Sequence, residues 1–520
     1  ETRSMFLQYG RWWGDASISG GMGGDRYHQA IYTADSGPVR TGSFELGMYY
    51  RMSAPELVLD NSAGVALAQE YLYDGAKLDG SGTSSLVDAG SGSAGELAGA
   101  AGSFALVRIA SIWDVREVLT AAKGIGVTGV LFDMAAPGRF FAFGDAGLTP
   151  GVTITAAEGD ALRAALAAGP VVFDWSATAV SPYVYNLAFH EDEVDSSAPL
   201  VARDGDLATV EENWHAQGSS KTVADTAAVI RPRYIGGAGV TDDLPTGITR
   251  TAYYTAGDGS TWQHLAGDFT IQSFMIDRQR TYAAGSHRAE SWFAGPARPG
   301  PWRENDGASF YVGLREYDVI GVEFAQWTDS DPNHAGRGNF LSDYGTLDLR
   351  ADGVSLGMQE TFGFMSGGWN VPAGPAVYEL EMNTRKNYVG PGDELSSATG
   401  TVWRFNSSTV DGVGALPMLV PSYDYDVDLF IRAPAVAGYR VGFGAEGQPG
   451  YEPGALPAKA WASYDEGATW VEVPVTGDGD AFAATVDNSA AANGYVSLRV
   501  ALTSADGSSV EQTILRAYAV

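Results

Sequence analysis

The hydrophobic pattern is of α/β type in one stretch near residue 100 and of strand type through most of the remaining chain. Residues 104–109 and 129–132 are short apolar runs, which are typical of buried strands. Between them, Asp114 is expected to cap a helix that contains Val115, Leu119 and Ala122 at helical spacing, and Gly124 or Gly126 is expected to end it. The pattern therefore predicts a strand–helix–strand unit.

A second helix is predicted after this unit. Thr155 and Glu158 have the spacing of a capping box, in which the hydroxyl accepts from the third residue's amide and the carboxylate reaches back to the cap. Leu162 and Leu166 then share one helical face. Together these elements predict a small α/β module.

Residues 181–520 have the pattern of β-structure and contain no long amphipathic helix. Asp-Gly pairs, such as 352–353 and 506–507, supply the positive φ that tight hairpin turns require. The strand-like runs between turns include 183–189, 270–276, 313–324, 377–382, 438–443 and 496–503. Short runs separated by turns in this way predict β-sandwiches.

We expect a mainly β fold of tandem β-sandwich domains, immunoglobulin- or fibronectin-III-like at the C-terminus, with one small α/β domain. Gly-Pro clusters at 295–301 and a turn-rich segment at 409–421 indicate boundaries. The expected domains are an N-terminal β segment that packs on the rest (1–52), the α/β domain (53–180) and three sandwiches (181–300, 301–415 and 416–520).

Composition and charge narrow the class of partner. The chain has 520 residues, 45% of them hydrophobic and 18% charged, which is typical of a globular multidomain protein. Its net charge of -31 repels phosphate groups, so nucleic acids and anionic membranes are not expected partners. The chain contains no cysteine, which excludes disulfides, zinc–thiolate sites and thiol catalysis. No run of ~20 apolar residues predicts a membrane span.

The α/β stretch resembles a protease-associated (PA) domain. The counterparts of that family's first strand, helix end, second strand and final turn are residues 105–107, 121–126, 129–131 and 149–152. The arginine–glycine usual after the first strand is replaced by Ile109-Ala110, so the turn at this point departs from the family pattern. The expected fold is therefore one PA-like α/β domain among β-sandwiches.

Further segments resemble the C-terminal region of large secreted actinobacterial subtilisin-like serine peptidases. They are, in order, 181–187, 206–210 with 214–215, 289–296, and 497–500 to 514–518. With the PA-like stretch, the resemblance covers most of the chain. It implies an extracellular protein whose PA domain shapes access to an active site and whose sandwiches serve as spacers and contact surfaces. The implied partners are a catalytic subtilisin-like domain or chain and protein or peptide substrates.

None of the three subtilase active-site signatures occurs in the sequence. They would supply an orienting aspartate, a histidine base and a serine nucleophile. Ser366, in 364–368, comes nearest to a nucleophile turn but lacks the Gly-x-Ser-x-Gly spacing, so we expect a glycine-rich β-turn. His190-Glu191 lacks the second histidine of a metalloprotease motif. We therefore predict no catalytic, cofactor-binding or metal-binding residue in this chain.

Three other patterns bear on function. Residues 463–470 fit the Asp-box of sialidase propellers. A propeller would repeat this motif along the chain, but only a partial second copy occurs, at 258–262, so we interpret the motif as a staple of a single hairpin. Asp424, Asp426 and Asp428 alternate, so on a strand they would form a solvated edge or, alternatively, hold calcium. The tryptophans are expected in the core, although some can form a sugar-stacking platform: Trp12, Trp13, Trp262, Trp292, Trp302 and Trp327.

Two functions stay open. The first is the non-catalytic accessory portion of a secreted subtilisin-like serine endopeptidase, which shapes substrate access and stabilises the enzyme. The alternative is an extracellular structural or adhesive β-sandwich protein that self-assembles or binds glycans without enzymatic activity. A glycosidase is a third reading, but the 63 acidic residues select no particular carboxylate pair.

Overall fold

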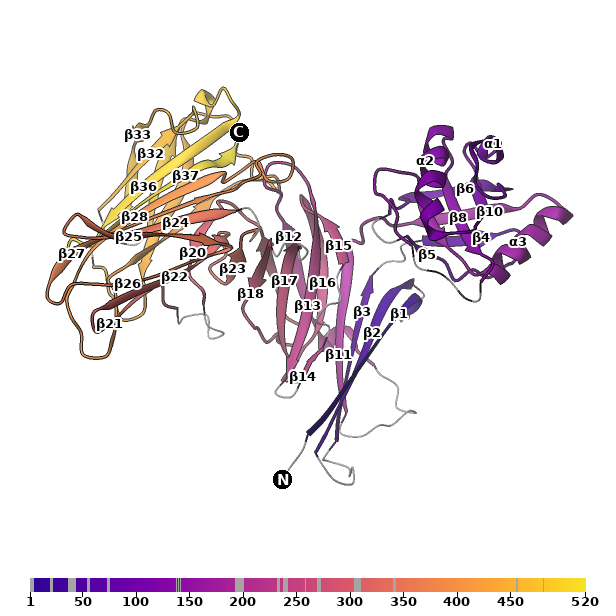
Figure 1. Cartoon of the computed structure of the whole chain (residues 1–520), viewed down its shortest axis with the longest axis horizontal. Helices are drawn as coiled ribbons and strands as arrows, with labels where there is room; N and C mark the ends of the chain where they lie inside the picture. The colour runs from indigo at the N-terminus through magenta and orange to yellow at the C-terminus, as the bar shows by residue number, and fades with distance from the viewer. Residues whose placement is uncertain are drawn as a thin grey trace. The chain divides into compact units, whose positions relative to one another are not determined.

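The computed structural model describes residues 4–18, 22–35, 44–53, 57–72, 75–136, 138, 140, 142–191, 201–231, 234–236, 242–257, 259–268, 273–303, 310–339, 343–454, 457–479 and 481–520. The chain divides into two compact units, Glu1–Val194 and Asp195–Val520 (Figure 1). The fold is mainly β, with sandwich-like domains and one α/β module, as expected. No described helix is long and apolar enough to cross a membrane.

The first unit contains an antiparallel sheet into which the α/β module is inserted. Strands β1 (Ser4–Ile18), β2 (Met22–Asp35) and β3 (Phe44–Ser53) are followed in the sheet by β11 (Tyr183–Glu191). Asn186 of β11 accepts hydrogen bonds from Tyr49 and Arg51 of β3, at 2.9 and 2.8 Å. The expected N-terminal segment therefore shares its sheet with a strand from beyond the α/β module.

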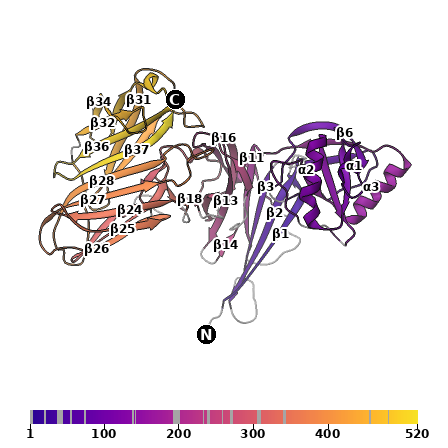
Figure 2. The ribbon, with the colours of Figure 1, turned by 45° about the horizontal axis from the view of Figure 1, so that its top comes forward.

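The α/β module has a seven-stranded sheet in the order β4-β10-β6-β7-β8-β9-β5. Strands β6 to β9 run parallel, and the others pair antiparallel. Helices lie outside the sheet (Figures 1 and 2). The elements are β4 (Leu57–Asn61), β5 (Glu70–Tyr71), β6 (Gly80–Asp88), α1 (Ala94–Leu97), β7 (Phe104–Ile109), α2 (Val115–Ile125), β8 (Gly129–Met134), β9 (Gly151–Thr153), α3 (Ala156–Ala168) and β10 (Val172–Ala177).

The two long helices cover opposite faces of this sheet. Leu119 of α2 belongs to the same apolar cluster as Val107 and Phe132, whereas Leu162 of α3 packs with the cluster that contains Leu106. Successive residues of a strand point to opposite faces, so each buried strand contributes to both clusters. This explains why residues 104–109 are apolar without alternation.

The ends of α2 agree with the sequence pattern in part. Gly126 ends the helix in the left-handed region at φ 82°, as predicted. Asp114 does not cap α2 with its side chain. Instead Ser111 caps a short 3₁₀ turn, Ile112–Asp114, and Asp114 accepts from the Ser111 amide at 3.0 Å. The predicted cap is therefore wrong, because Asp114 belongs to a turn that begins earlier.

The capping box of α3 is confirmed. The Glu158 amide donates to the Thr155 hydroxyl at 3.2 Å, and the Thr155 amide donates to the Glu158 carboxylate at 2.6 Å. Replacing Thr155 with alanine should lower the free energy of unfolding by about 1 kcal/mol, since one helix amide loses its acceptor. Urea unfolding of T155A, with T155S as the matched control that keeps the hydroxyl, measures this. Equal stability of the alanine and serine variants would contradict it.

The second unit begins with a sandwich of two sheets. One has the order β16-β12-β19 and the other β14-β13-β17-β18-β23, with β15 paired to β13. Trp214, Val223, Ala266, Met275 and Trp292 pack between them. The strands are β12 (Leu207–Trp214), β13 (Thr222–Arg231), β14 (Tyr234–Gly236), β15 (Asp242–Pro245), β16 (Ile248–Thr255), β17 (Thr261–Asp268), β18 (Ser273–Asp277), β19 (His287–Trp292) and β23 (His334–Arg337).

The rest of the second unit is built around an eight-stranded sheet, β25-β24-β27-β28-β37-β36-β32-β33. Its strands are β24 (Tyr344–Ala351), β25 (Val354–Phe362), β27 (Ala376–Arg385), β28 (Ala398–Ser407), β32 (Ala458–Ser463), β33 (Val471–Val473), β36 (Tyr495–Thr503) and β37 (Ser509–Ala519). Two smaller sheets accompany it. They contain β20 (Arg298–Gly300), β21 (Gly313–Glu316), β22 (Val319–Thr328), β26 (Phe364–Asn370) and β29 (Val413–Ala415), and then β30 (Leu419–Tyr425), β31 (Tyr439–Gly447), β34 (Val475–Asp478) and β35 (Ala481–Val486).

The eight-stranded sheet continues through the boundary expected at 415/416. Strand β28 pairs with β37, with Val402 opposite Glu511. One apolar cluster extends from Phe310 to Ala519. The two expected sandwiches thus share a sheet and a core. The expected single run at 313–324 is also two strands, β21 and β22, which turn at Tyr317 with φ 50°.

Candidate functional site

Ser366 does not lie on a nucleophile turn. It is in the middle of strand β26, where it pairs with Glu323 of β22. The expected glycine-rich turn is also wrong, because Gly367 and Gly368 continue the ladder opposite Val322 and Gly321. A serine at such a position has the extended backbone of an ordinary strand rather than the sharp turn that exposes a nucleophile.

Asp424, Asp426 and Asp428 do not lie along one strand. Strand β30 ends at Tyr425, and Asp428 accepts from the amides of Phe430 and Arg432 at 2.8 and 3.0 Å. All three side chains are exposed. Within the described ranges, no group of three or more histidine or acidic residues is placed to hold a metal ion. The alternative of a shared calcium site therefore has no support from the geometry.

The Asp-box at 463–470 forms the predicted hairpin staple. It joins β32 to β33, and Asp465 accepts from the Thr469 amide at 2.8 Å and from its hydroxyl at 2.6 Å. Gly467 takes the positive φ of 87° that the turn requires. The Arg499 guanidinium carbon lies over the Trp470 ring, 4.3 Å from the ring centroid. These contacts give the motif a structural role.

The tryptophans do not form a described sugar platform. Trp262 and Trp292 are 1% and 0% exposed, and Trp327 is also buried. Trp302 is partly buried, and the side chains of Trp12 and Trp13 lie outside the described residues. The expectation of a core position is confirmed for these three rings, each of which is buried in a strand, and the alternative of a sugar platform does not hold for them.

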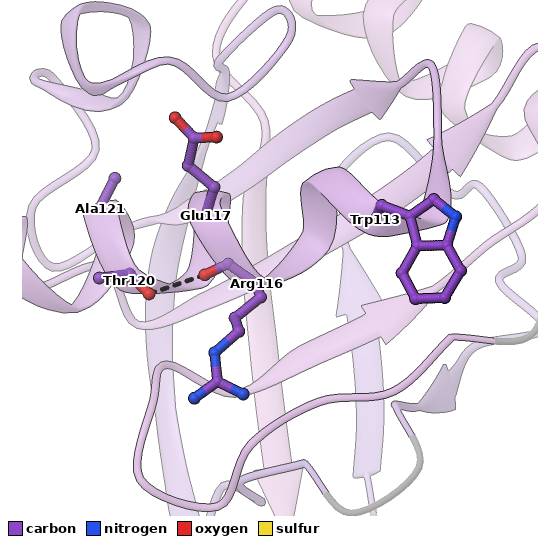
Figure 3. A pocket seen from close by; sticks show the side chains of 5 residues that line it. All are labelled: Trp113, Arg116, Glu117, Thr120 and Ala121. Carbon is purple, nitrogen blue, oxygen red and sulfur yellow. Dashed lines mark hydrogen bonds between the residues drawn. The ribbon is translucent and has the colours of Figure 1, made fainter.

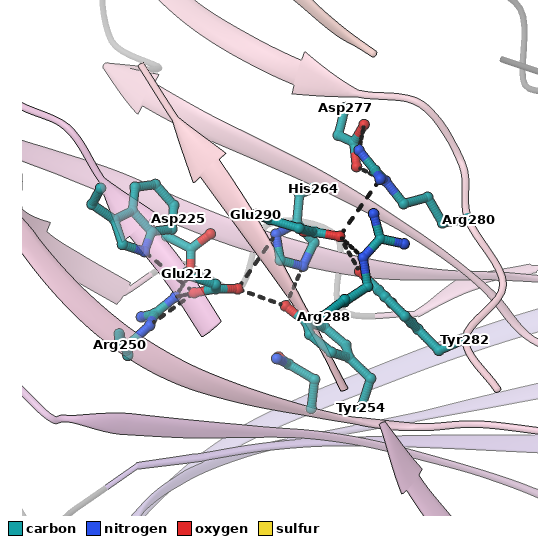
Figure 4. Close-up of polar contacts among 12 residues, drawn as sticks. Glu212, Asp225, Arg250, Tyr254, His264, Asp277, Arg280, Tyr282, Arg288 and Glu290 are labelled. Atoms are coloured by element: carbon teal, nitrogen blue, oxygen red, sulfur yellow. Dashed lines mark hydrogen bonds and ion pairs between the residues drawn. The ribbon is translucent and has the colours of Figure 1, made fainter. Parts of the chain in front are cut away.

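A buried cluster of charged side chains occupies the interior of the first sandwich (Figure 4). Glu212 of β12 pairs with Arg250 of β16 at 2.8 Å, and Arg250 also pairs with Asp225 of β13. These three side chains are at most 3% exposed. Tyr254 donates to Glu212 at 3.0 Å and hydrogen-bonds to His264. Burial raises the pKa of Tyr254 well above its usual value, so its hydroxyl stays a donor.

A second group of charges lies beside the first. Glu290 is the register neighbour of Glu212 on the parallel strand β19, so the two carboxylates share one face of the sheet. Arg280 approaches Glu290 at 3.6 Å and hydrogen-bonds to Asp277 at 2.6 Å. Tyr282 donates to Glu290 at 3.4 Å and stacks on Tyr254 at 4.8 Å between ring centroids. The cluster therefore joins both sheets through hydrogen bonds and stacked rings.

His334, which pairs with an aspartate as a catalytic histidine would, is also buried in this interior. His334 Nδ1 lies 2.9 Å from Asp329 Oδ2, and the imidazole stacks on Trp292 at 4.3 Å. Both members of the dyad are fully buried. A group without access to solvent cannot reach a substrate, so the His334–Asp329 pair and the neighbouring charges are structural. Sequence patterns did not identify them.

The exposed candidate is a hollow on the α/β module (Figure 3). It has a volume of about 580 Å³ and is lined by Trp113, Arg116, Glu117, Thr120 and Ala121. These positions fall on one stripe of α2 and the turn before it, opposite the buried stripe. Trp113 is 85% exposed. An exposed aromatic ring near charged side chains suits contact with another protein better than chemistry.

Comparison with known proteins gives no family. No family model matches the chain, and no curated protein matches it. Among solved structures, it is similar to the aminopeptidase from Aneurinibacillus sp. strain AM-1, with 19% identity, a TM-score of 0.22 and 36% of each chain covered. It is also similar to BSAP, a zinc aminopeptidase from Bacillus subtilis, with 19% identity, a TM-score of 0.20, and 26% of this chain and 34% of that chain covered.

A third similarity is to the FN1–FN3 domains of chicken CNTN1, with 9% identity, a TM-score of 0.12, and 58% of this chain and 99% of that chain covered. The chain spans about a third of the length of the two aminopeptidases, 36% and 34%. At these TM-scores the alignments establish neither the fold nor the activity of this chain.

Proposed function

We propose that this chain is the non-catalytic accessory portion of a secreted subtilisin-like serine endopeptidase. The observation that carries the proposal is the inserted α/β module. Its parallel strands and the helices α2 and α3 follow the order that the PA resemblance implies. The module shapes substrate access, and the sandwiches of residues 201–520 stabilise and space the assembly.

The way the module is inserted supports this role. Its entry strand β4 and exit strand β10 are antiparallel neighbours, with Leu57 opposite Ala177. Both connections therefore leave from one edge of the sheet, whereas the hollow at Trp113 lies on α2 and the turn before it.

Fluorophosphonate labelling tests the proposal, because the probe reacts only with activated serines. The native particle that contains this chain would be isolated, labelled and analysed by mass spectrometry. We expect the label on a serine outside the 520 residues, on either the same or a bound polypeptide. An unlabelled particle, alongside a labelled subtilisin control, would overturn the proposal. A label on any serine within the 520 residues would also overturn it, since the chain would then be catalytic.

One observation favours the alternative of an extracellular self-assembling protein. Strand β25 is an edge of the eight-stranded sheet, and it exposes Val354, Met358 and Phe362 by 67%, 62% and 53%. Glu360 is its single charged residue. Edge strands of this kind pair with other chains unless a charge protects them. If β25 mediates assembly, M358K should shift a concentration-dependent oligomer to monomer in analytical ultracentrifugation, while V377K on a central strand should not.

A further inference from the structure

The sequence contains a single Asp-Pro pair, Asp331-Pro332, and it lies in the turn between β22 and β23. An aspartate before proline can break its own peptide bond, because a side-chain oxygen can attack the carbonyl carbon of the same residue and close a five-membered ring. The proline nitrogen carries no hydrogen in the chain and leaves as a secondary amine. This turn therefore holds a nucleophile directly beside a bond that it can break.

The turn fixes both the carboxylate and the carbonyl of Asp331. Its Oδ1 accepts from the amide and the side-chain Nδ2 of Asn333, at 2.9 and 2.8 Å. Its carbonyl oxygen accepts from the His334 amide at 3.1 Å, which polarises the carbonyl that would be attacked. The Asp331 side chain is 21% exposed and Pro332 is exposed, so water can reach this bond.

His334 places a proton donor beside the same residue. Its Nδ1 lies 2.9 Å from Asp329 Oδ2, and its Nε2 lies 4.0 Å from Asp331 Oδ2. This Nε2 atom is buried and forms no hydrogen bond within the part of the chain that the structure describes. Burial keeps substrates from outside away from the His334–Asp329 pair, whereas a bond of the chain itself is already beside it.

The surrounding charges hold both groups in the protonation states that cleavage requires. Burial raises the pKa of Asp331, but His334 and the hydrogen bonds from Asn333 outweigh this and lower it. Burial lowers the pKa of His334, but Asp329 and Asp331 raise it to about 9. Near neutral pH a nucleophilic carboxylate therefore faces an acidic imidazolium. The other charged or titratable groups around this pair are Asp277, Arg280, Arg298 and His215.

We infer that the bond between Asp331 and Pro332 is a self-cleavage site of this chain. Asp331 Oδ2 bonds to the Asp331 carbonyl carbon, the carbon–nitrogen bond breaks, and the Pro332 nitrogen takes the proton of His334 Nε2. The products are a cyclic anhydride on Asp331 and a new amino terminus at Pro332. Water then opens the anhydride to two carboxyl groups, and one proton returns to His334. Asp329 is a positioning residue, because it orients the imidazole.

Incubation of the purified full chain near neutral pH tests the inference. Phenylmethylsulfonyl fluoride and EDTA exclude contaminating peptidases, and intact-mass spectrometry follows the fragments 1–331 and 332–520. We expect cleavage at a rate that does not depend on protein concentration, whereas the chain unfolded in urea should stay intact. Hydroxylamine should trap the anhydride as a hydroxamate on the fragment that ends at Asp331. An intact bond in the folded chain, or equal cleavage of the folded and unfolded chains, would overturn the inference.

Variants assign the roles within the site. D331E keeps the charge but should lose cleavage, because glutamate would have to close a larger ring. H334Q should slow cleavage about a hundredfold, since the general acid is lost. P332A keeps every charge at an exposed position and should also slow it, because an alanine nitrogen accepts the proton less readily. D60N, an exposed carboxylate of the other unit, is the control and should cleave as the unaltered chain does. Unchanged cleavage in D331E or H334Q would contradict the assigned roles and overturn the inference.

The pH profile separates this site from ordinary acid hydrolysis of an Asp-Pro bond. The rate should be level across the neutral range and decline above about pH 9, where His334 loses its proton. In D329N this decline should move to lower pH, because the imidazolium loses its strongest attraction. A rate that rises only below about pH 4, where aspartate becomes protonated, would overturn the inference. No serine takes part, so the inference does not depend on the proposed function, and the fluorophosphonate result leaves it unchanged.

Discussion

Replacing Arg250 with leucine is expected to destabilise the first sandwich of the second unit by about 3–5 kcal/mol. Arg250 is 3% exposed and holds two carboxylates, Glu212 and Asp225, that are both 0% exposed. Leucine would leave these two negative charges buried without a cation. The loss of stability comes mainly from the two unpaired buried carboxylates rather than from the lost attraction to Arg250. These carboxylates have no hydrating water in the low-dielectric interior, so without a cation their charge is unfavourable.

Hydrogen exchange measured by mass spectrometry, combined with urea titration, locates the effect in residues 201–337. The matched control is R404L, which breaks the exposed pair of Arg404 with Glu379 and should cost at most about 1 kcal/mol. The triple variant R250L/E212L/D225L should recover part of the loss, since it removes the stranded charges together with their partner. A cost below that of R404L, or no recovery in the triple variant, would show that the cluster is not an interdependent ionic core.

The local elements of the α/β module were predictable because their signals are local. Residues 104–109 are apolar at every position but one, which only a strand covered on both faces requires. Thr155 and Glu158 satisfy their hydrogen bonds within a single helical turn. Gly126 supplies a positive φ where α2 must stop. Each of these signals needs no information on distant partners.

Sheet organisation was not predictable in the same way. The strand pattern identifies which positions face inward but not which strand lies alongside. Strand β28 pairs with β37, more than a hundred positions away, and β3 pairs with β11 across the whole α/β module. The turn-rich segment 409–421 contains β29 and the start of β30, which belong to the two smaller sheets, whereas the eight-stranded sheet takes strands from both sides of it. Domain boundaries placed at turns therefore assign strands that share a core to different expected domains.

The buried ionic cluster of the first sandwich has a signal in the sequence. In β12, inward positions alternate, and Glu212 lies in phase with Ala208, Val210 and Trp214. A charged residue at an apolar phase predicts a buried partner of opposite charge. Trp113 shows the reverse signal, because it is a large apolar residue out of phase with the buried stripe of α2. Residues that violate the local pattern mark both of these features.

The second large effect is expected in the pH dependence of stability. Burial alone lowers the pKa of His334, but the carboxylates of Asp329, Asp331 and Asp277 overcome this and raise it to about 9 from 6.5. Trp292 stacks on the ring, and Arg280 lies 4.0 Å from Asp331 Oδ2, the oxygen that His334 Nε2 also approaches at 4.0 Å. The folded state therefore holds the His334 proton more tightly than the unfolded state.

The direction of the pH dependence follows from the difference in proton binding between the folded and the unfolded state. The stabilisation by His334 is fully present below about pH 6.5 and is lost as pH rises through about 9, where the folded protein also releases the proton. A shift of this size corresponds to a loss on the order of 3 kcal/mol across that window. Burial raises the pKa of Tyr254 and Tyr282 well above 10, so these tyrosines do not titrate in the same range.

Urea titrations at pH 6, 8 and 9.5, read out by hydrogen exchange in residues 273–337, measure this loss. In H334Q the imidazole is absent, so the decline above neutral pH should disappear even though the variant is less stable at pH 6. D329N separates the two possible origins of the decline. Removing the Asp329 charge should move the decline to lower pH, because the imidazolium loses its strongest attraction. A decline of the same size and midpoint in H334Q would assign the alkaline loss to another group.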